Sequence, residues 1–230
     1  MNGILLIDKP KGITSYDVIR SIKPFFPPKY KIGHAGTLDP FATGLLIILV
    51  GKATKQMDRI LSLHKKYSFI AEFGYSTDTQ DITGEVICRD DKRITEEEIK
   101  NSCESMIGEY MQQPPIYSAK KINGTASYKL ARQGENPVLE KKKVEIFSFN
   151  VKNYNWPKVS FEATVSSGTY VRTLVIDLAS MHKTYATTIQ LTRNAIGKFR
   201  VEDSINIEDI SPSKIKDNLI SIEKLDEYFN

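Results

Sequence analysis

The chain has 230 residues, of which 40% are hydrophobic and 26% charged, a composition typical of a globular protein with one sizeable domain. Its net charge of +4 is uneven, because residues 201–230 carry −5 and residues 1–200 therefore +9. This favours a polyanionic partner for the basic part, although a basic solvated surface gives the same numbers. No apolar run approaches the roughly 20 residues of a membrane span. Two cysteines without a CxxC pair argue against a disulfide framework and a structural zinc site.

The first half of the chain predicts a mixture of strands, helices and loops. Residues 4–8 form an apolar run typical of a strand, and Asp8 comes too early for a signal peptide, so we expect a cytoplasmic location. Thr14 and Ser15 are good caps for a helix that ends before Pro24. The other elements expected here are a glycine-rich loop over 31–44, a buried strand over 45–50, a helix over 52–63, a strand over 67–73 and a polar loop over 74–84.

The second half continues without a regular repeat. Residues 95–98 fit a capping box, which predicts a helix to about residue 107. The other elements expected are a strand over 116–122, a helix over 127–133, strands over 144–151 and 159–165, a helix over 169–181, and strands over 189–193 and 198–201. Because strands and helices do not alternate regularly, the order predicts an α+β fold and not a doubly wound sheet.

A glycine-rich segment, Gly33–Leu46, is the first candidate for chemistry. Its glycines allow a backbone that a ligand can approach closely, and Pro40 holds Asp39 near the extended region. The segment lacks the Gly-Lys-Ser/Thr ending of a phosphate-binding P-loop and is not a dinucleotide fingerprint. For a lone Asp-Pro pair, a plain capped turn is the more frequent reading. His34, between glycines, is the histidine best placed for function.

Three further segments carry weaker signals. Ser166–Thr173 joins a predicted strand to a helix N-terminus, where Arg172 can pair with a carboxylate or a phosphate; the alternative is a surface arginine. Tyr67 offers a ring face for stacking on a base, but a tyrosine in a strand is more often simply part of the core. Lysines and tyrosines alternate over residues 117–134, as on a nucleic-acid surface, although a surface hairpin has a similar pattern.

Together and in order, these segments resemble the tRNA pseudouridine-55 synthase family, known in bacteria as TruB. Gly33–Leu46 is similar to the family's catalytic motif, GH(T/A)GTLDPxATGLL. The resemblance covers about residues 3–200. Its other blocks are Gly3–Gly12, Lys66-Tyr67, Gly74–Gly84, Pro114–Lys121, Tyr128–Gly134, Gly168–Thr173 and Leu191-x-Arg193.

The resemblance implies a fold, a reaction and a set of site residues. The fold is a mixed, largely antiparallel sheet flanked by helices, and the reaction isomerises the T-loop uridine 55 of tRNA to pseudouridine without cofactor or metal. Asp39 matches the essential carboxylate, and Arg172 beside it would favour its ionised state. The substrate-binding positions implied are His34, Tyr67, Tyr170, Arg172 and Leu191.

The resemblance also implies domain boundaries and partners. Residues 1–200 are expected to form the catalytic domain, within which residues 113–143 form a thumb-like insertion that grips the T arm of tRNA. Residues 201–230 form a short acidic segment where many members carry an RNA-binding PUA domain, so the chain is either a short member or one with a truncated remnant. Relatives that work with guide RNA have longer extensions, so we expect a monomer without guide RNA.

Two rival functions stay open at this point. A non-catalytic RNA-binding or tRNA-folding module would be expected to have lost one of Asp39, Tyr67 and Arg172, all of which are present. A nucleoside or glycoside hydrolase would need a second acid to donate a proton, for which Asp78 or Asp81 are the candidates.

Overall fold

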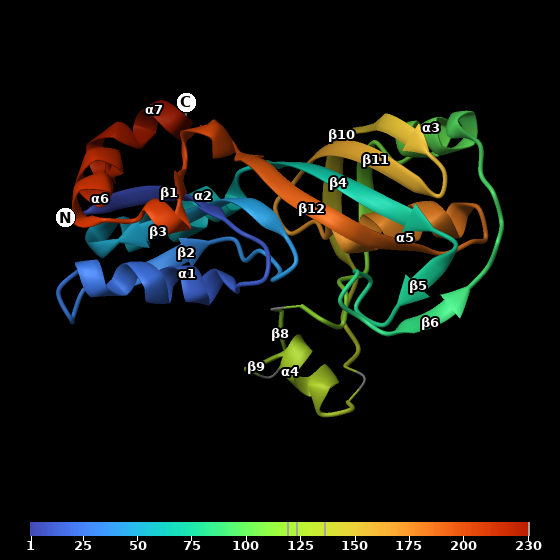
Figure 1. Ribbon diagram of the computed structural model, residues 1–230, viewed down its shortest axis with the longest axis horizontal. Coiled ribbons are helices and arrows are strands. Elements are labelled where there is room, and N and C mark those ends of the chain that lie inside the picture. The colour runs from blue at the N-terminus through green and yellow to red at the C-terminus, as the bar shows by residue number, and fades with distance from the viewer. Residues whose placement is uncertain (119, 123, 136, 230) are drawn as a thin grey trace. The chain divides into compact units, whose positions relative to one another are not determined.

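The structure is a computed structural model and describes residues 1–118, 120–122, 124–135 and 137–229. It divides into two compact units, Met1–Tyr67 with Leu191–Asn230, and Ser68–Gln190. The boundaries fall inside two strands, β4 (Lys65–Phe73) and β12 (Ala186–Ile196), so each of these strands belongs partly to both units (Figure 1). None of the helices among the described residues is long and apolar enough to cross a membrane.

The first unit is built on a mixed sheet with the strand order β14-β1-β3-β12. β1 and β3 pair antiparallel over their whole lengths, whereas β3 pairs parallel with β12. Besides its part of β12 and β4, this unit contains the strands β1 (Gly3–Lys9), β2 (Ile32–Ala35), β3 (Thr43–Val50), β13 (Phe199–Arg200), β14 (Ile205–Asn206) and β15 (Ile220–Ser221). Its α-helices are α1 (Ser15–Ile22), α2 (Met57–Ser62), α6 (Pro212–Asn218) and α7 (Asp226–Phe229). Its 3-10 helices are η1 (Lys23–Phe25), η2 (Gly51–Gln56), η3 (Val201–Asp203), η4 (Ile207–Asp209) and η5 (Ile222–Lys224).

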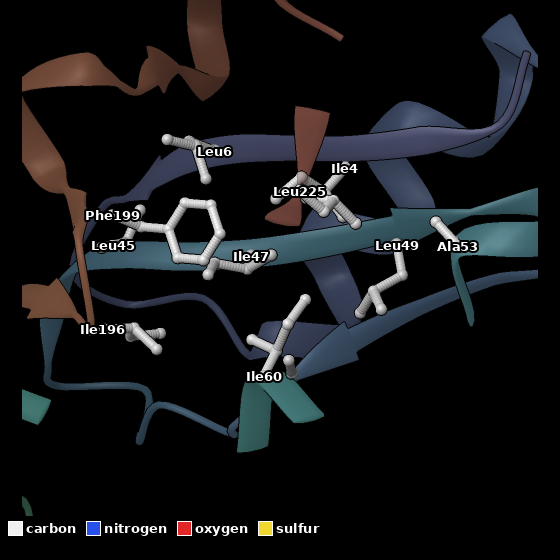
Figure 2. Packing of buried hydrophobic residues seen from close by; sticks show 11 residues of the cluster. Ile4, Leu6, Leu45, Ile47, Leu49, Ala53, Ile60, Ile196, Phe199 and Leu225 are labelled. Atoms are coloured by element: carbon white, nitrogen blue, oxygen red, sulfur yellow. The ribbon is translucent and has the colours of Figure 1, made fainter. Parts of the chain in front are cut away.

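Strand β3 is buried on both faces, which explains its continuous apolar sequence. Successive side chains of a strand point to opposite faces. Leu45, Ile47 and Leu49 therefore pack into one cluster, shown in Figure 2, and the intervening residues pack into a second cluster with α1. Each fully buried aliphatic side chain contributes roughly 1.5–3 kcal/mol, so these two clusters are the stable base from which the preceding loop extends.

The acidic segment after Arg200 is folded onto the first unit. β14 pairs parallel and β15 antiparallel with β1. Leu225 joins the cluster of Figure 2, and the ring of Tyr228 stacks on Phe199 with 4.4 Å between centroids. Arg59 forms an ion pair of 2.7 Å with Asp226 and also lies over the ring of Phe229. The acidic side chains of the segment are thus exposed, whereas its apolar side chains pack against the rest of the first unit.

The part of the sheet in the second unit has the order β4-β11-β10-β7, in which β10 pairs antiparallel with both β11 and β7. Helix α3 packs against β10 and against α5. The two-stranded sheets β5-β6 and β8-β9 are separate from this sheet, and β8, β9 and α4 form a small lobe of their own (Figure 1). The strands are β5 (Tyr75–Thr77), β6 (Val86–Arg89), β7 (Gly108–Gln112), β8 (Lys121–Ile122), β9 (Thr125–Ala126), β10 (Lys142–Asn155) and β11 (Lys158–Val165). The helices are α3 (Glu96–Ser105), α4 (Ser127–Arg132) and α5 (Val171–Met181).

The α+β class with a largely antiparallel sheet is confirmed, and so are both capped helices, α1 and α3. Three expectations were wrong. Residues 32–35, expected in a loop, pair with β3 as β2. Residues 75–77, expected in the polar loop 74–84, pair with β6 as β5. Residues 116–122 form a strand only at their end, because the carbonyls of Ser118 and Lys120 accept hydrogen bonds from the backbone around the start of α4. Ala119, part of the block 114–121, lies outside the described residues.

Candidate active site

The loop that carries Asp39 is fixed through its main chain. The hydroxyl of Ser15 bonds both the N–H of Leu38, at 2.9 Å, and its carbonyl, at 3.1 Å. The carbonyl of Pro40 accepts from the N–H of Gly12 at 2.7 Å. Asp39 is half-buried between these two anchored residues. The anchors therefore hold the backbone on both sides of the carboxylate, which is what a preorganised catalytic group requires.

Lys9 lies buried beneath the same loop. Its Nζ donates to the carbonyls of Pro10 and Ile13, both at 2.9 Å, and of Pro40 at 3.4 Å. Burial lowers the pKa of Lys9 to about 8, although the negative charge of Asp39 acts to raise it. The two charges are thus close enough to interact, and a cation here favours the ionised form of Asp39.

We expect Lys9→Met to lower the free energy of unfolding by roughly 1–3 kcal/mol at pH 7.5, because buried carbonyls lose their donor. The folded pKa of about 8 lies below the ordinary value of 10.5. At a pH between these two pKa values, Lys9 carries a proton in the unfolded chain but has lost it in the folded chain. The free energy of unfolding of wild type therefore increases as the pH rises through this range. Urea unfolding at pH 7.5 and 9.5 should therefore show a gap between the two proteins that widens with pH. Equal stabilities at both pH values would contradict this role.

Arg193 ties the loop to strand β12. Its guanidinium, almost fully buried, donates to the carbonyl of Leu45 at 2.8 Å and to that of Gly36 at 2.9 Å. Gly44 has a φ of +100° and packs on the backbone of Arg193, where an added Cβ would lie 2.4 Å from the carbonyl oxygen. A glycine is therefore required at this crossing of two chain segments.

His34 lies on β2, paired opposite Ile48 of β3. Its Nδ1 is buried and has no hydrogen-bond partner among the described residues. Burial, aided by the positive charge of Arg193, lowers the pKa of His34 below 6.5. The imidazole is therefore neutral near pH 7 and offers one donor and one acceptor.

Tyr67 and Leu191 are the residues of the first unit at which the chain leaves it and returns to it. The first unit ends its first segment at Tyr67, in β4, and begins its second at Leu191, in β12. Tyr67 is 9% exposed and Leu191 7%, so both are largely packed within the protein.

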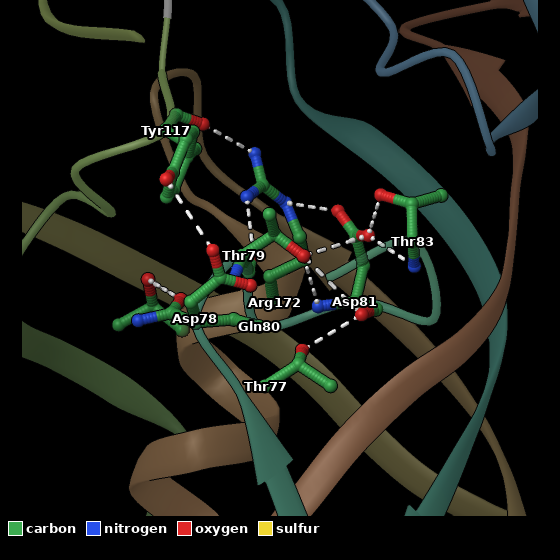
Figure 3. A network of polar contacts seen from close by, with 9 residues as sticks. Thr77, Asp78, Thr79, Gln80, Asp81, Thr83, Tyr117 and Arg172 are labelled. Atoms are coloured by element: carbon green, nitrogen blue, oxygen red, sulfur yellow. Dashed lines mark hydrogen bonds and ion pairs between the residues drawn. The ribbon is translucent and has the colours of Figure 1, made fainter. Parts of the chain in front are cut away.

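Arg172 is the centre of a polar network in the second unit (Figure 3). It lies in the first turn of α5, is 3% exposed, and donates to the carbonyls of Thr79 at 2.8 Å and Tyr117 at 2.9 Å. Its Nε forms an ion pair of 3.8 Å with the buried carboxylate of Asp81. One guanidinium thus joins the loop after β5, the segment before β8 and the start of α5.

Asp81 is held in turn by its own neighbours. Its Oδ1 accepts from the hydroxyl of Thr79 at 3.0 Å, and from the N–H of Thr83 at 2.9 Å and its hydroxyl at 2.5 Å. Asp81 is the acceptor in each of these bonds. Asp78 is also engaged, since it accepts from the hydroxyl of Tyr117 at 3.3 Å. Both of the acids considered for a hydrolase are thus hydrogen-bonded within the second unit.

The predicted site residues fall in both units. Asp39, His34, Tyr67 and Leu191 belong to the first, whereas Tyr170 and Arg172 belong to the second. Tyr170 is the N-cap residue of α5 and is half-buried. The expected pairing of Arg172 with Asp39 stays a prediction.

From the sequence alone, no site role was assigned to Lys9 or Arg193, Ser15 was treated only as a helix cap, and Asp81 was considered only as a possible acid. The available signal was a cation directly after the predicted strand 4–8, at Lys9, and at the end of the predicted strand 189–193, at Arg193. Within the described ranges, no group of three or more His, Cys, Asp or Glu side chains is arranged to hold a metal ion.

Comparison with known proteins identifies relatives over almost the whole chain. Residues 23–171 match the family model of the TruB family pseudouridylate synthase, N-terminal domain. The chain is 42% identical to tRNA pseudouridine synthase B of Clostridium tetani (strain Massachusetts / E88), over 100% of this chain and 83% of the relative. It is also 42% identical to tRNA pseudouridine synthase B of Thermotoga petrophila, over 99% of this chain and 73% of the relative.

Among solved structures, the chain is similar to one in the crystal structure of a Cbf5-Nop10-Gar1 complex. The TM-score is 0.72 and the identity 24%, over 99% of this chain and 58% of the solved chain. At this identity the likeness shows the fold alone, and the chain spans little more than half the length of that relative.

Proposed function

The chain belongs to the TruB family of pseudouridylate synthases, and we propose that it isomerises uridine 55 in the T loop of tRNA to pseudouridine, with Asp39 as the catalytic carboxylate. The reaction class follows from the family and from tRNA pseudouridine synthases about 40% identical over nearly the whole chain. The observation that carries the assignment to Asp39 is its loop, anchored on both sides by Ser15 and Gly12.

The reaction breaks the C1′–N1 bond of uridine, turns the uracil and forms a C1′–C5 bond. N1 takes up a proton and C5 loses one, so the change is redox-neutral and needs no energy source. The carboxylate of Asp39 serves either as the nucleophile at C1′ or as the base that removes a ribose proton. Both roles require the ionised form, which the charge of Lys9 favours.

The proposal includes flipping of the target base out of the RNA loop, at a cost of a few kcal/mol. Tyr67 is proposed to stack on the flipped base and Leu191 to make an apolar contact with it. His34, Tyr170 and Arg172 are proposed to contact the nucleotide. A neutral His34 can both donate and accept a hydrogen bond there.

We expect Tyr67→Ala to lower kcat/KM by about 10- to 100-fold, the loss of one base–aromatic stack of ~1–3 kcal/mol. Tyr67→Phe keeps the ring and should retain most of this activity. Multiple-turnover kinetics on unmodified tRNA measure both variants. Equal losses in the two would point to the hydroxyl and not to stacking.

Residues 113–143 are proposed to grip the T arm, within a catalytic domain of residues 1–200 that precedes the acidic segment 201–230. Lys141, Lys142 and Lys143 are exposed. The ammonium of Lys142 also lies at Gly168, where an added Cβ would be 2.9 Å away. Cations at these positions supply phosphate affinity that falls as salt rises and does not depend on sequence. Recognition then rests on the shape of the arm.

A tritium-release assay tests the function as a whole. Wild type is mixed with unmodified tRNA that carries tritium at uracil C5, and the modified position is mapped afterwards. Release from a single T-loop uridine supports the proposal. If the protein binds tRNA but releases no tritium, a non-catalytic binding module is favoured. Activity on free uridine would favour a hydrolase. We also propose that the protein acts as a monomer without guide RNA, in the cytoplasm where tRNA is modified.

A further inference from the structure

Gln112, the last residue of β7, holds the main chain of Tyr170 from both sides. Its side chain is 1% exposed. The Oε1 atom accepts from the N–H of Tyr170 at 2.7 Å, and Nε2 donates to the carbonyl of Tyr170 at 3.1 Å. Nε2 also donates to the hydroxyl of Tyr110, two residues earlier on the same strand. A buried amide therefore has both its donor and its acceptor used by one residue of another element.

The residue held in this way stands at the junction between a loop and a helix. Tyr170 is the N-cap residue of α5, and its side chain makes no cap hydrogen bond. The preceding loop contains Gly168 with a φ of +84°, a conformation that few other residues adopt. The carbonyl of Tyr170 also accepts from the N–H of Leu174, at 3.0 Å, and so begins the helix. Gln112 thus sets where the loop ends and where α5, with Arg172 in its first turn, begins.

The hydroxyl of Tyr110, which accepts from Nε2, is itself held by a second residue of α5. The hydroxyl of Tyr110 is hydrogen-bonded to Asp177 of α5, and the positive charge of Lys141 acts on Asp177. Burial raises the pKa of Tyr110 and that of Asp177. Gln112 is also the residue directly before the insertion 113–143. It therefore connects the insertion proposed to bind the T arm with Tyr170, which is proposed to contact the nucleotide.

We propose that Gln112 is a positioning residue for the isomerisation, which orients Tyr170 and the start of α5 toward the bound nucleotide. This inference rests on the proposed function, because that function gives Tyr170 its contact with the nucleotide. Gln112 does not touch the reacting atoms and acts through the main chain of Tyr170. A simple structural role would also predict lost stability on substitution, so the test must measure something besides folding.

Gln112→Met and Gln112→Glu separate the two roles. Gln112→Met has a similar shape but no hydrogen-bonding atoms, and displacement of a substrate contact by about 1 Å costs on the order of 10²-fold in rate. We therefore expect a ~10- to 100-fold fall in kcat for folded protein, with tRNA affinity within a few-fold of wild type. Gln112→Glu keeps the acceptor for the N–H of Tyr170 but, when ionised, cannot donate to its carbonyl.

The pH profile of Gln112→Glu is the decisive readout. Protonation restores the donor, so its kcat relative to wild type should rise as pH falls from 8 to 6. The control is Gln56→Glu on η2, in the first unit, whose ratio to wild type should not change with pH. Tritium release in single turnovers gives the rates, and thermal unfolding and filter binding check the fold and the affinity.

The outcomes are distinguishable. If wild type is active and both Gln112 variants keep its kcat, the positioning role is overturned and the proposed function is unaffected. A kcat of Gln112→Glu equal to that of wild type at every pH from 6 to 8 would also overturn it, and this variant serves if Gln112→Met does not fold. No tritium release from wild type would remove the proposed function and this inference together.

Discussion

Asp39→Asn is expected to lower turnover by at least about 10³-fold, because a carboxamide can act neither as nucleophile nor as base. The fold should stay intact. The anchors of the loop bond the main chain of Gly36, Leu38 and Pro40, and the substitution leaves all of these bonds in place. Affinity for tRNA should change by no more than a few-fold, since phosphate contacts from lysines supply most of it.

Single-turnover tritium release measures the chemical step in Asp39→Asn, and filter binding measures its affinity. Asp58→Asn is the matched control, since Asp58 is exposed on α2, away from the loop in sequence, and should keep the wild-type rate. Turnover of Asp39→Asn within 10-fold of wild type would reject the catalytic assignment. Loss of binding together with turnover would show that the residue shapes the loop and does not itself react.

Arg172→Lys is expected to lower kcat by about 10²-fold and the free energy of unfolding by roughly 1–3 kcal/mol. The guanidinium donates to the carbonyls of Thr79 and Tyr117 and forms an ion pair with the carboxylate of Asp81. An ammonium on a flexible stem cannot match this planar fork. Arg172→Met should cost more, about 3–5 kcal/mol, because it leaves a buried carboxylate without its cation.

A double-mutant cycle with Asp81→Asn separates the ion pair from the carbonyl contacts. If the pair is coupled, Arg172→Met combined with Asp81→Asn should lose less stability than the sum of the single losses. Additive losses would show that the ion pair with Asp81 does not contribute to the stabilisation. A wild-type rate and melting temperature in Arg172→Lys would refute the need for the fork.

The fold was predictable where a local pattern decides it. The apolar run of β3, the cap residue of α1 and the capping box of α3 are local signals, and all three elements are present. β2 was missed because its glycine and histidine favour a loop, and only pairing with β3 makes it a strand. The elements after Arg200 had no periodic signal strong enough to predict. Their apolar residues are short runs that gain order by packing on β1 and Phe199.

The site was predictable in its motif residues but not in its supports. Asp39 stood out because glycines and Pro40 surround it in the sequence. Ser15 and Gln112 act on backbone atoms of residues 23 and 58 positions away. A polar residue that bonds a distant main chain has no signature of its own in one sequence, since its partner is set only by the fold.

The pairing of β1 has a consequence for the order in which the chain folds. β1 is synthesised well before its neighbours β14 and β15, which lie after residue 200. Residues 68–190 form one continuous unit, which can therefore complete its own fold while β1 still has an open edge. During synthesis this edge presents unpaired backbone groups, a known template for aggregation. Residues 201–230 thus cover the open edge of β1 only after the rest of both units has been synthesised.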